Sequence, residues 1–347
     1  MKHLSRIAQS LVFFLPFCLI AQYTDVINSN RPGQSVSAYA VGRNVVQAEM
    51  GVSYERDKHS LLQTESNFLG VDLALRYGLL FETLELYWEG TYQKENISYN
   101  GLGFDAARTD FSRNRLGLKF LIYDPFKNPE NNKPDLYSWR ANHKFKWKNL
   151  LPAVSVYGGA NFILGDNPFY PEDPTISPRA MIATQSRITP RFVLISNISY
   201  DRIGSDFPEM GYIISLTHAL RNPKWSIFVE NQGIKSDRYS DSILRTGTAY
   251  LFNKNFQADM NIGASLKNTP SKYFGTIGFS YRLDMHQDKL VPIEDQNGGE
   301  NGQIGRNSMK KSKGEDGGAE LGLTKKQLKK QKKMAKRKQR KEGSYEF

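Results

Sequence analysis

The chain has 347 residues, a formal net charge of +12, 12% aromatic residues and a single cysteine. Most of the positive charge lies in residues 324–347, where eleven Lys or Arg stand against Glu342 and Glu346, so the basic composition describes the end of the chain and not a folded domain. Cys18 lies in a segment that export would remove, which excludes disulfide bonds and thiol chemistry from the mature protein.

The first residues predict export. Lys2 and Arg6 precede an apolar run over 11–21, which is too short to span a bilayer but has the length of a signal-peptide core. We expect a signal peptide over residues 1–21. No later apolar run approaches the roughly 18 residues that a membrane helix requires. The exported chain is therefore either a secreted all-β protein or a membrane barrel.

Residues 45–283 show the period-2 alternation of β-strands. Twelve strands are predicted, at about 45–56, 67–78, 84–93, 111–123, 153–164, 179–188, 191–201, 210–220, 225–232, 243–252, 256–266 and 273–283. In the second strand, Leu73 and Leu75 alternate with Asp72 and Arg76. An apolar face toward lipid and a charged face toward a narrow interior are typical of a membrane barrel, although a soluble sandwich also alternates. We expect an all-β, antiparallel transmembrane β-barrel of about twelve strands in the outer membrane.

The connectors between these strands predict an orientation. Short connectors are expected at 78–82, 188–191, 221–224 and 253–255, and longer ones at 56–65, 94–110, 165–178 and 231–241. Barrels have short periplasmic turns and longer outer loops. Residues 124–149 break this rule, because they form a long connector at the periplasmic end. Their Trp and Phe among Lys and Arg predict either an interfacial segment on the inner leaflet or a disordered loop.

The last predicted strand carries a short order of residues that resembles the closing-strand signal of outer-membrane barrels. A polar residue is followed by Gly two positions on, an aromatic residue five on and an aliphatic residue seven on, at Thr276, Gly278, Tyr281 and Leu283. The barrel-assembly machinery recognises such a signal. We therefore expect this machinery, and the lipid of the outer membrane, as partners.

The regions outside the barrel differ from it in composition. Residues 22–44 form a lead-in rich in Asn, Ser, Gly and Pro, and residues 284–323 are predicted to be a flexible linker. Residues 324–347 form a disordered basic tail, which an even number of strands places in the periplasm. An anionic partner is expected there (peptidoglycan, lipid headgroups or an acidic protein) and no nucleic acid. The alternative is a solvated tail without a target. The binding candidates are Lys325, Lys326, Lys329, Lys330, Lys332, Lys333, Lys336, Arg337, Lys338, Arg340 and Lys341.

Charged residues of both signs are predicted to face the barrel lumen. They could line a translocation path, but their interleaved signs favour a lumen that is narrow or filled by mutually paired side chains. The candidates are Glu49, Asp72, Arg76, Glu85, Glu89, Arg115, Lys119, Asp201, Glu230 and Asp259.

No catalytic, cofactor or metal site is expected. A membrane-barrel phospholipase would need a Ser–His pair on the lipid-facing surface, and the sequence around His218 does not support one. His59, His143 and His286 lack the spacing of metal ligands.

Residues 25–283 resemble a family of outer-membrane barrel transporters named after the MetA pathway of phenol degradation. The resemblance lies in residues 30–35 (NRPGQS), Gly42 and residues 47–51 (QAEMG), with Glu230 and Gln257-x-Asp259 in later strands. Asn30 stands where the family usually has an acid. The resemblance implies an outer-membrane barrel that takes up small, often aromatic, compounds.

Two functions stay open at this point. The preferred one is passive passage of small solutes. The other is a filled-lumen barrel that anchors or assists an envelope complex through the basic tail.

Overall fold

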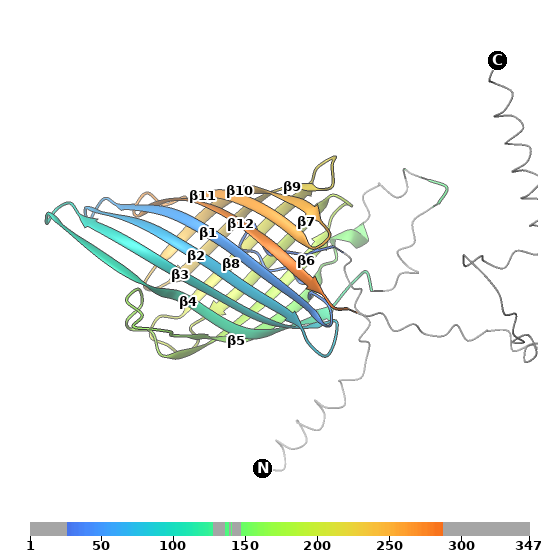
Figure 1. Ribbon diagram of the computed structural model, residues 1–347, viewed down its shortest axis with the longest axis horizontal. Helices are drawn as coiled ribbons and strands as arrows, with labels where there is room; N and C mark the ends of the chain where they lie inside the picture. Colours follow the sequence, from blue (N-terminus) through green and yellow to red (C-terminus); the bar gives the residue numbers. More distant parts are fainter. Residues whose placement is uncertain (1–25, 128–135, 139, 141–146, 287–347) are drawn as a thin grey trace, which may run out of the picture. The chain divides into compact units, whose positions relative to one another are not determined.

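Twelve antiparallel strands close into one barrel in the computed structural model, which describes residues 26–127, 136–138, 140 and 147–286. Each strand pairs with its neighbours in sequence, and β1 pairs with β12 to close the wall (Figure 1). This confirms the predicted barrel class and strand number. The strands are β1 (Val45–His59), β2 (Thr64–Gly78), β3 (Leu84–Tyr99), β4 (Phe104–Tyr123), β5 (Ala153–Phe162), β6 (Ile176–Arg187), β7 (Phe192–Asp201), β8 (Glu209–Ala219), β9 (Trp225–Ser236), β10 (Ser240–Asn253), β11 (Phe256–Ser265) and β12 (Ser271–Asp284).

The outer face of the wall is apolar. Ile198 and Ile262 are each 61% exposed and Ile277 is 71% exposed, while the alternate positions of the same strands are buried. A continuous apolar band of this kind is stable in lipid and not in water. The protein is therefore an outer-membrane barrel. The part of the chain that the structure describes contains no helix long and apolar enough to cross a membrane.

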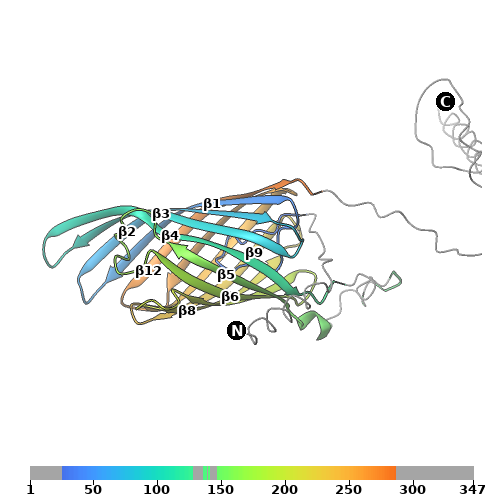
Figure 2. The same cartoon turned by 90° about the horizontal axis from the view of Figure 1, so that it is seen from below.

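Strands β1 to β4 are longer than predicted, so the connectors expected at 56–65 and 94–110 are wrong. The connector expected at 231–241 is also wrong, because β9 and β10 extend into it and leave only residues 237–239. These strands contain 15, 15, 16 and 20 residues, whereas about 9–11 tilted residues cross a bilayer. The extra length extends the wall on one side of the barrel (Figure 2). It lacks the apolar pattern of a lipid-facing strand because it lies beyond the lipid. Cross-strand ion pairs support it instead, including Arg56–Glu65 at 3.0 Å and Lys272–Glu55 at 2.7 Å.

The opposite end of the barrel carries the short turns 79–83, 188–191, 220–224 and 254–255, close to the predicted positions. Val45 and Asp284 pair there, so the barrel begins and ends at this end. Of the connector 124–149, residues 128–135, 139 and 141–146 lie outside the described part. A short 3₁₀ helix, η2 (Trp147–Leu150), precedes β5, and Trp147 is exposed. The interfacial interpretation of this connector stays a prediction.

Residues 26–44 lie inside the barrel, and we call them the plug segment. The amide of Ile27 donates to the carbonyl of Lys254 at 2.8 Å, and the amide of Asn44 donates to the carbonyl of Gly78 at 3.0 Å. Both bonds lie at the end with the short turns, so the segment enters and leaves the lumen at the same end. Residues 35–42 are buried between these points. The sequence pattern predicted a lead-in here and did not place it in the lumen.

Two apolar clusters fix the plug segment against the wall. Val36 packs with Tyr87, Tyr157 and Met181. Nearer the short turns, residues 38 and 39 pack with residues 121 and 153. The barrel interior therefore has a small apolar core, which exists only because the plug segment contributes to it.

We predict that Gly78→Ala destabilises the barrel, because a Cβ at Gly78 would lie 1.6 Å from the carbonyl oxygen of Gly42. Two backbones cannot keep that distance, so one of them has to move. The movement would disturb the point at which the plug segment leaves the lumen. The urea concentration at which the folded, heat-modifiable band disappears from gels should fall. Gly158→Ala is the matched control, because a Cβ there has nothing within 4 Å. Equal midpoints for the two variants would contradict the prediction.

Candidate functional site

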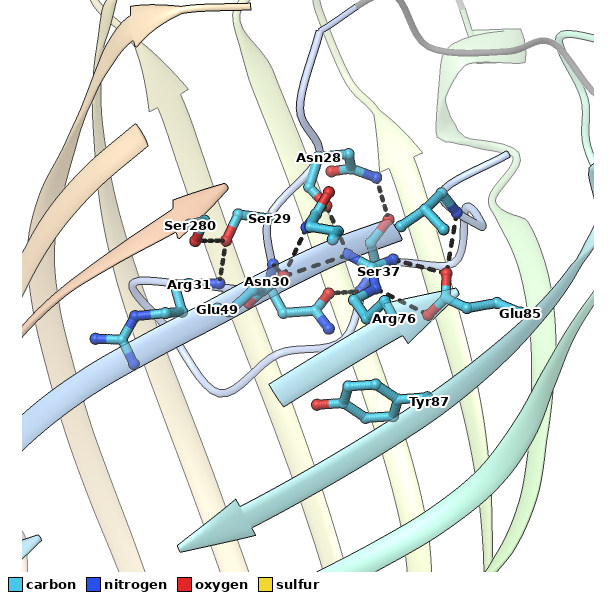
Figure 3. Close-up of polar contacts among 12 residues, drawn as sticks. Asn28, Ser29, Asn30, Arg31, Ser37, Glu49, Arg76, Glu85, Tyr87 and Ser280 are labelled. Carbon is cyan, nitrogen blue, oxygen red and sulfur yellow. Dashed lines mark hydrogen bonds and ion pairs between the residues drawn. The ribbon is translucent and has the colours of Figure 1, made fainter. Parts of the chain in front are cut away.

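Buried charges in the half of the lumen nearest the short turns hold the plug segment. Arg76 is fully buried and forms two hydrogen bonds with Glu85, at 2.8 and 2.9 Å (Figure 3). It also donates to the carbonyl of Asn28 at 2.6 Å. Lys119 lies 3.2 Å from Glu85 and donates to the carbonyls of Ser37 and Tyr39. The wall charges thus pair with one another and use the plug backbone as their remaining partner.

The tip of the plug segment is fixed by Arg31. Its guanidinium pairs with Asp259 on β11 at 3.1 Å. Gly51 on β1 and Gly278 on β12 pair with each other, and a Cβ on either would lie within 2.3 Å of this guanidinium. Gln257 donates to the Arg31 carbonyl at 3.2 Å. The two glycines therefore form a notch in the wall that only the absence of side chains permits.

Glu230 on β9 holds the next residues of the tip. Its carboxylate accepts hydrogen bonds from the amides of Gln34 at 3.0 Å and Ser35 at 3.1 Å. Arg245 pairs with the same carboxylate at 2.8 Å. A Cβ at Gly33 would lie 2.5 Å from Glu230, so the chain passes close to the wall at this point. The carboxylate binds two backbone amides and one guanidinium, which satisfies its charge in a fully buried position.

Neutral side chains complete the attachment on the remaining strands. Asn197 on β7 accepts from the amide of Val36 at 2.7 Å and donates to its carbonyl at 2.8 Å. Gln185 on β6 accepts from the hydroxyl of Ser37 at 2.7 Å. Ser29 contacts Ser280 on β12 through their hydroxyls, which are 2.7 Å apart. The plug segment is bound on all sides of the barrel and fills the lumen at this level.

Beyond the tip of the plug segment, a cavity of about 450 Å³ occupies the outer part of the lumen. Gln34 and Val36 of the plug segment form part of its lining, and residues of the connector 163–175 lie near its mouth. Seven basic and five acidic side chains line it: Arg108, Arg113, Arg115, Arg179, Arg202, Arg245 and Lys272 against Glu55, Asp72, Glu89, Asp173 and Glu209. Carboxylates just outside this lining pair with several of the bases, Glu95 with Arg108, Asp201 with Arg115 and Arg179, and Glu230 with Arg245, so the cavity presents charges of both signs.

The connector 163–175 is held across the mouth by arginines from two other connectors. Asp173 accepts from Arg202 at 2.7 Å and from Arg238 at 2.9 Å. Both guanidiniums also lie over the ring of Tyr170, at 4.8 and 5.3 Å from its centre. Arg108 on β4 donates to the carbonyl of Pro168. These contacts narrow the entrance and give it a wall of alternating aromatic rings and guanidiniums.

The structure separates the ten lumen-facing candidates into three groups. Glu49, Arg76, Glu85, Lys119, Glu230 and Asp259 contact the plug segment directly or through a neighbour. Glu89, Arg115 and Asp201 form a chain of ion pairs on the wall, joined by Tyr87, Asn161 and Arg179. Asp72 accepts a hydrogen bond from Thr91 at 2.7 Å.

The other candidates lie on β12 or outside the described residues. Tyr281 and Leu283 are exposed on the outer face of β12, whereas Thr276 faces inward and Gly278 forms the notch for Arg31. Their recognition by the barrel-assembly machinery stays a prediction. The signal peptide, the linker beyond residue 286 and every tail-binding candidate lie outside the described part. His218 stacks on Phe192 with ring centres 4.2 Å apart.

Sequence reasoning missed the plug segment itself. Its residues are polar and small, without alternation, and such a stretch reads as a linker. One available signal was the number of inward charges in a narrow lumen, since Arg76, Glu85 and Glu230 each also bond to the plug segment. Another was the position of the family-like motifs: residues 30–35, 47–51, 230 and 257–259 are far apart in sequence and meet at the tip of the plug segment.

We predict that Glu230→Gln loosens the plug segment. A cysteine in place of Ser35, which is 4% exposed, reports the change through its reaction with a water-soluble maleimide. Breaking a buried ion pair costs about 3–5 kcal/mol, so labelling should accelerate by more than about tenfold. Glu209→Gln is the control, because Glu209 pairs with Arg202 at the mouth and not with the plug segment. Equal labelling rates in the two variants would show that Glu230 does not hold the tip.

Comparisons with known proteins extend this description. The chain is similar in structure to an outer membrane channel from Pseudomonas putida F1, with 10% identity and a TM-score of 0.44 over 74% of this chain and 100% of that one. It is also similar to a deltaS2S3 mutant of the TodX monoaromatic hydrocarbon channel (9% identity, TM-score 0.38, 75% and 96% coverage) and to the KdgM porin (8%, 0.37, 67% and 99%). No curated protein matches the sequence.

The family described as "Putative MetA-pathway of phenol degradation" matches residues 29–283, from the plug segment to the end of β12. The match confirms the resemblance seen in the motifs, and the chain belongs to this family.

Proposed function

We propose that this protein is a channel through which small solutes diffuse across the outer membrane, and that the plug segment controls its opening. The observation that carries the proposal is the cavity of about 450 Å³ that lies beyond the plug segment. A cavity of this size accommodates a small organic molecule. Its polar, charged lining suits a solute in transit more than a permanently buried apolar ligand.

The attachment of the plug segment supports a reversible closure. Both of its ends leave the lumen at the same end of the barrel, at Ile27 and Asn44, so the segment can withdraw as a loop without threading. Many of its contacts are hydrogen bonds and ion pairs, which water can replace when the segment leaves, although the packing of Val36, Ala38 and Tyr39 in apolar clusters is then lost. An individual hydrogen bond contributes only about 0.5–1.5 kcal/mol net for this reason.

We infer that the solutes include small aromatic compounds. Tyr87, Tyr157 and Phe274 line it, and the rings of Tyr87 and Tyr157 meet edge to face with centres 6.1 Å apart. The family's description, which refers to phenol degradation, agrees with this class. The proposal is passage and not catalysis.

A barrel that serves only as an anchor is not favoured. The lumen is filled at one level by a segment of the chain's own N-terminal region, and not along its whole length by wall side chains. An anchor has no use for the outer cavity or for a detachable closure.

Removal of the plug segment should enlarge the conductance. We predict that a variant without residues 26–41 gives larger and more frequent steps in planar bilayers than the full-length protein. The physical reason is that the narrowest part of the lumen is then filled by water. Heat-modifiable migration on gels verifies that the barrel still closes. Silence of both proteins would reject the channel and favour the anchor.

A reversible lock provides the control. The double variant Ser29→Cys and Ser280→Cys places two thiols where hydroxyl oxygens lie 2.7 Å apart, close enough for a disulfide after small adjustments. Oxidation should hold the full-length channel closed, reductant should restore it, and either single variant should not respond. Unchanged conductance after oxidation would mean that the plug segment does not control opening.

We further propose that the basic tail lies in the periplasm and binds an anionic partner. The support is that Asp284 ends β12 beside Val45, at the end with the short turns. We predict that full-length protein sediments with peptidoglycan sacculi or with anionic vesicles at low salt, and that a chain ending at Leu283 does not. High salt should release it, because the attraction is electrostatic. Equal sedimentation of both chains would show that the tail does not contribute to the interaction.

A further inference from the structure

A second cavity of about 60 Å³ lies beside the tip of the plug segment. Asn30, Arg31 and Gln34 line it from the plug segment, and residues of β1 to β4 line it from the wall. It shares six lining residues with the outer cavity, Gln34, Asp72, Tyr87, Glu89, Thr91 and Arg113, so the two adjoin. A solute in the outer cavity can therefore reach into it with a small group.

Arg113 is a cation at this junction whose charge acts on the carboxylate of Glu89 without a direct contact. It has no hydrogen bond to another described residue, and no described carboxylate lies within the 4.0 Å of an ion pair. The arginines around it are paired, Arg31 with Asp259 and Arg115 with Glu89 and Asp201. Arg113 also lines the outer cavity, so its donors are accessible to a solute in that cavity.

A local irregularity of the wall places Arg113 there. The register of β3 and β4 shifts after Thr91, which pairs with Arg113, while Tyr92 pairs with Phe111. Ser112 is the extra residue of this β-bulge. Bulges redirect side chains and are frequent beside binding sites. Asp72, Thr91 and Arg113 consequently form one row across β2, β3 and β4.

Asn30 supplies a second unused donor. Its side-chain oxygen accepts from the amide of Ser37 at 3.0 Å, which fixes the orientation of the amide group. Its Nδ2 is buried and has no hydrogen-bond partner among the described residues. The pocket therefore contains two groups that can donate and do not.

The acidic residues of the pocket already have donors. Glu49 accepts from Gln47 at 2.7 Å and from the amide of Asn30, and Glu89 accepts from Tyr87 and Arg115, each at 2.8 Å. Asp72 accepts from Thr91. Glu49 accepts through Oε1 and Asp72 through Oδ1 alone, so the pocket offers acceptors as well as the two donors. A ligand that matches the donors of Arg113 and Asn30 supplies acceptors, and a carboxylate supplies them with a charge opposite to that of Arg113.

We propose that this pocket binds the carboxylate of a small organic anion through Arg113 and the Asn30 amide, with the body of the solute in the outer cavity against Tyr87. The volume of about 60 Å³ admits a group of a few heavy atoms and excludes an aromatic ring. The site rests on the proposed function in one respect, since it takes the anion to be a solute of the channel. The occupant touches both the wall and the plug segment.

The test is calorimetric titration of the full-length protein in detergent with sodium benzoate and with benzamide, its neutral counterpart. Benzoate should bind, and benzamide should bind at least about tenfold more weakly, because charge-assisted bonds are the stronger ones. Arg113→Gln should weaken benzoate by at least about tenfold, and Arg113→Lys should weaken it less. Asn30→Asp keeps the oxygen that Ser37 needs and replaces the donor by an acceptor, so it should also weaken benzoate.

Arg191→Gln is the matched control, because it removes the same charge from an exposed turn at the opposite end of the barrel. Equal affinity of wild type and Arg113→Gln, or equal affinity for benzoate and benzamide, would overturn the proposal. Titration does not require conductance, so the two failures are distinguishable. If benzoate binding depends on Arg113 but the barrel does not conduct, the channel is rejected and the binding site is kept. If the barrel conducts but benzoate binding does not depend on Arg113, the channel is kept and the binding site is rejected.

Discussion

The structure depends on the pairing of buried charge inside a closed wall. A twelve-stranded barrel has an interior too narrow to hydrate Arg76, Glu85 and Glu230 while the plug segment is in place, and an unpaired charge there would cost several kcal/mol or more. The wall strands supply some of the partners. The plug segment supplies the others through backbone carbonyls and amides, together with the guanidinium of Arg31. Its irregular conformation follows from this role, since a helix or strand would use those backbone groups itself.

In the proposed channel, polar attachment would let one stable barrel both close and open. An apolar plug would expose its surface on leaving, and the lumen would lose the same burial. Here the polar groups on both sides would be hydrated when the segment withdraws, so they would cost less than their number indicates, and the two small apolar clusters would account for the rest of the difference. The same exchange leaves a few donors unmatched at the edge of the segment. Arg113 and Asn30 are of this kind, and they mark where the closure and the solute space meet.

The wall was predictable from the sequence, because lipid on one side and charge on the other impose period-2 alternation on each membrane-crossing strand. Position 73 faces out and position 76 faces in for this reason alone. Beyond the lipid the constraint disappears, and the outer ends of β1 to β4 were therefore taken for loops. The plug segment was not predictable in this way. Arg31 and Asp259 are separated by 228 positions, and no local pattern in either stretch indicates the other. Neither the alternation nor the family motifs indicates Arg113. Its lack of a hydrogen-bond partner among the described residues is a property of the folded lumen.

The position of the plug segment at the start of the barrel sequence sets an order of assembly. It precedes every strand, yet its contacts on β9, β11 and β12 exist only after the last strands have joined the wall. The earliest part of the folded chain is thus the last to reach its final place. Because it enters from the end where β1 begins and β12 ends, it needs no passage through the bilayer. The fully bound plug segment therefore distinguishes a closed barrel from one in which β1 and β12 have not yet paired.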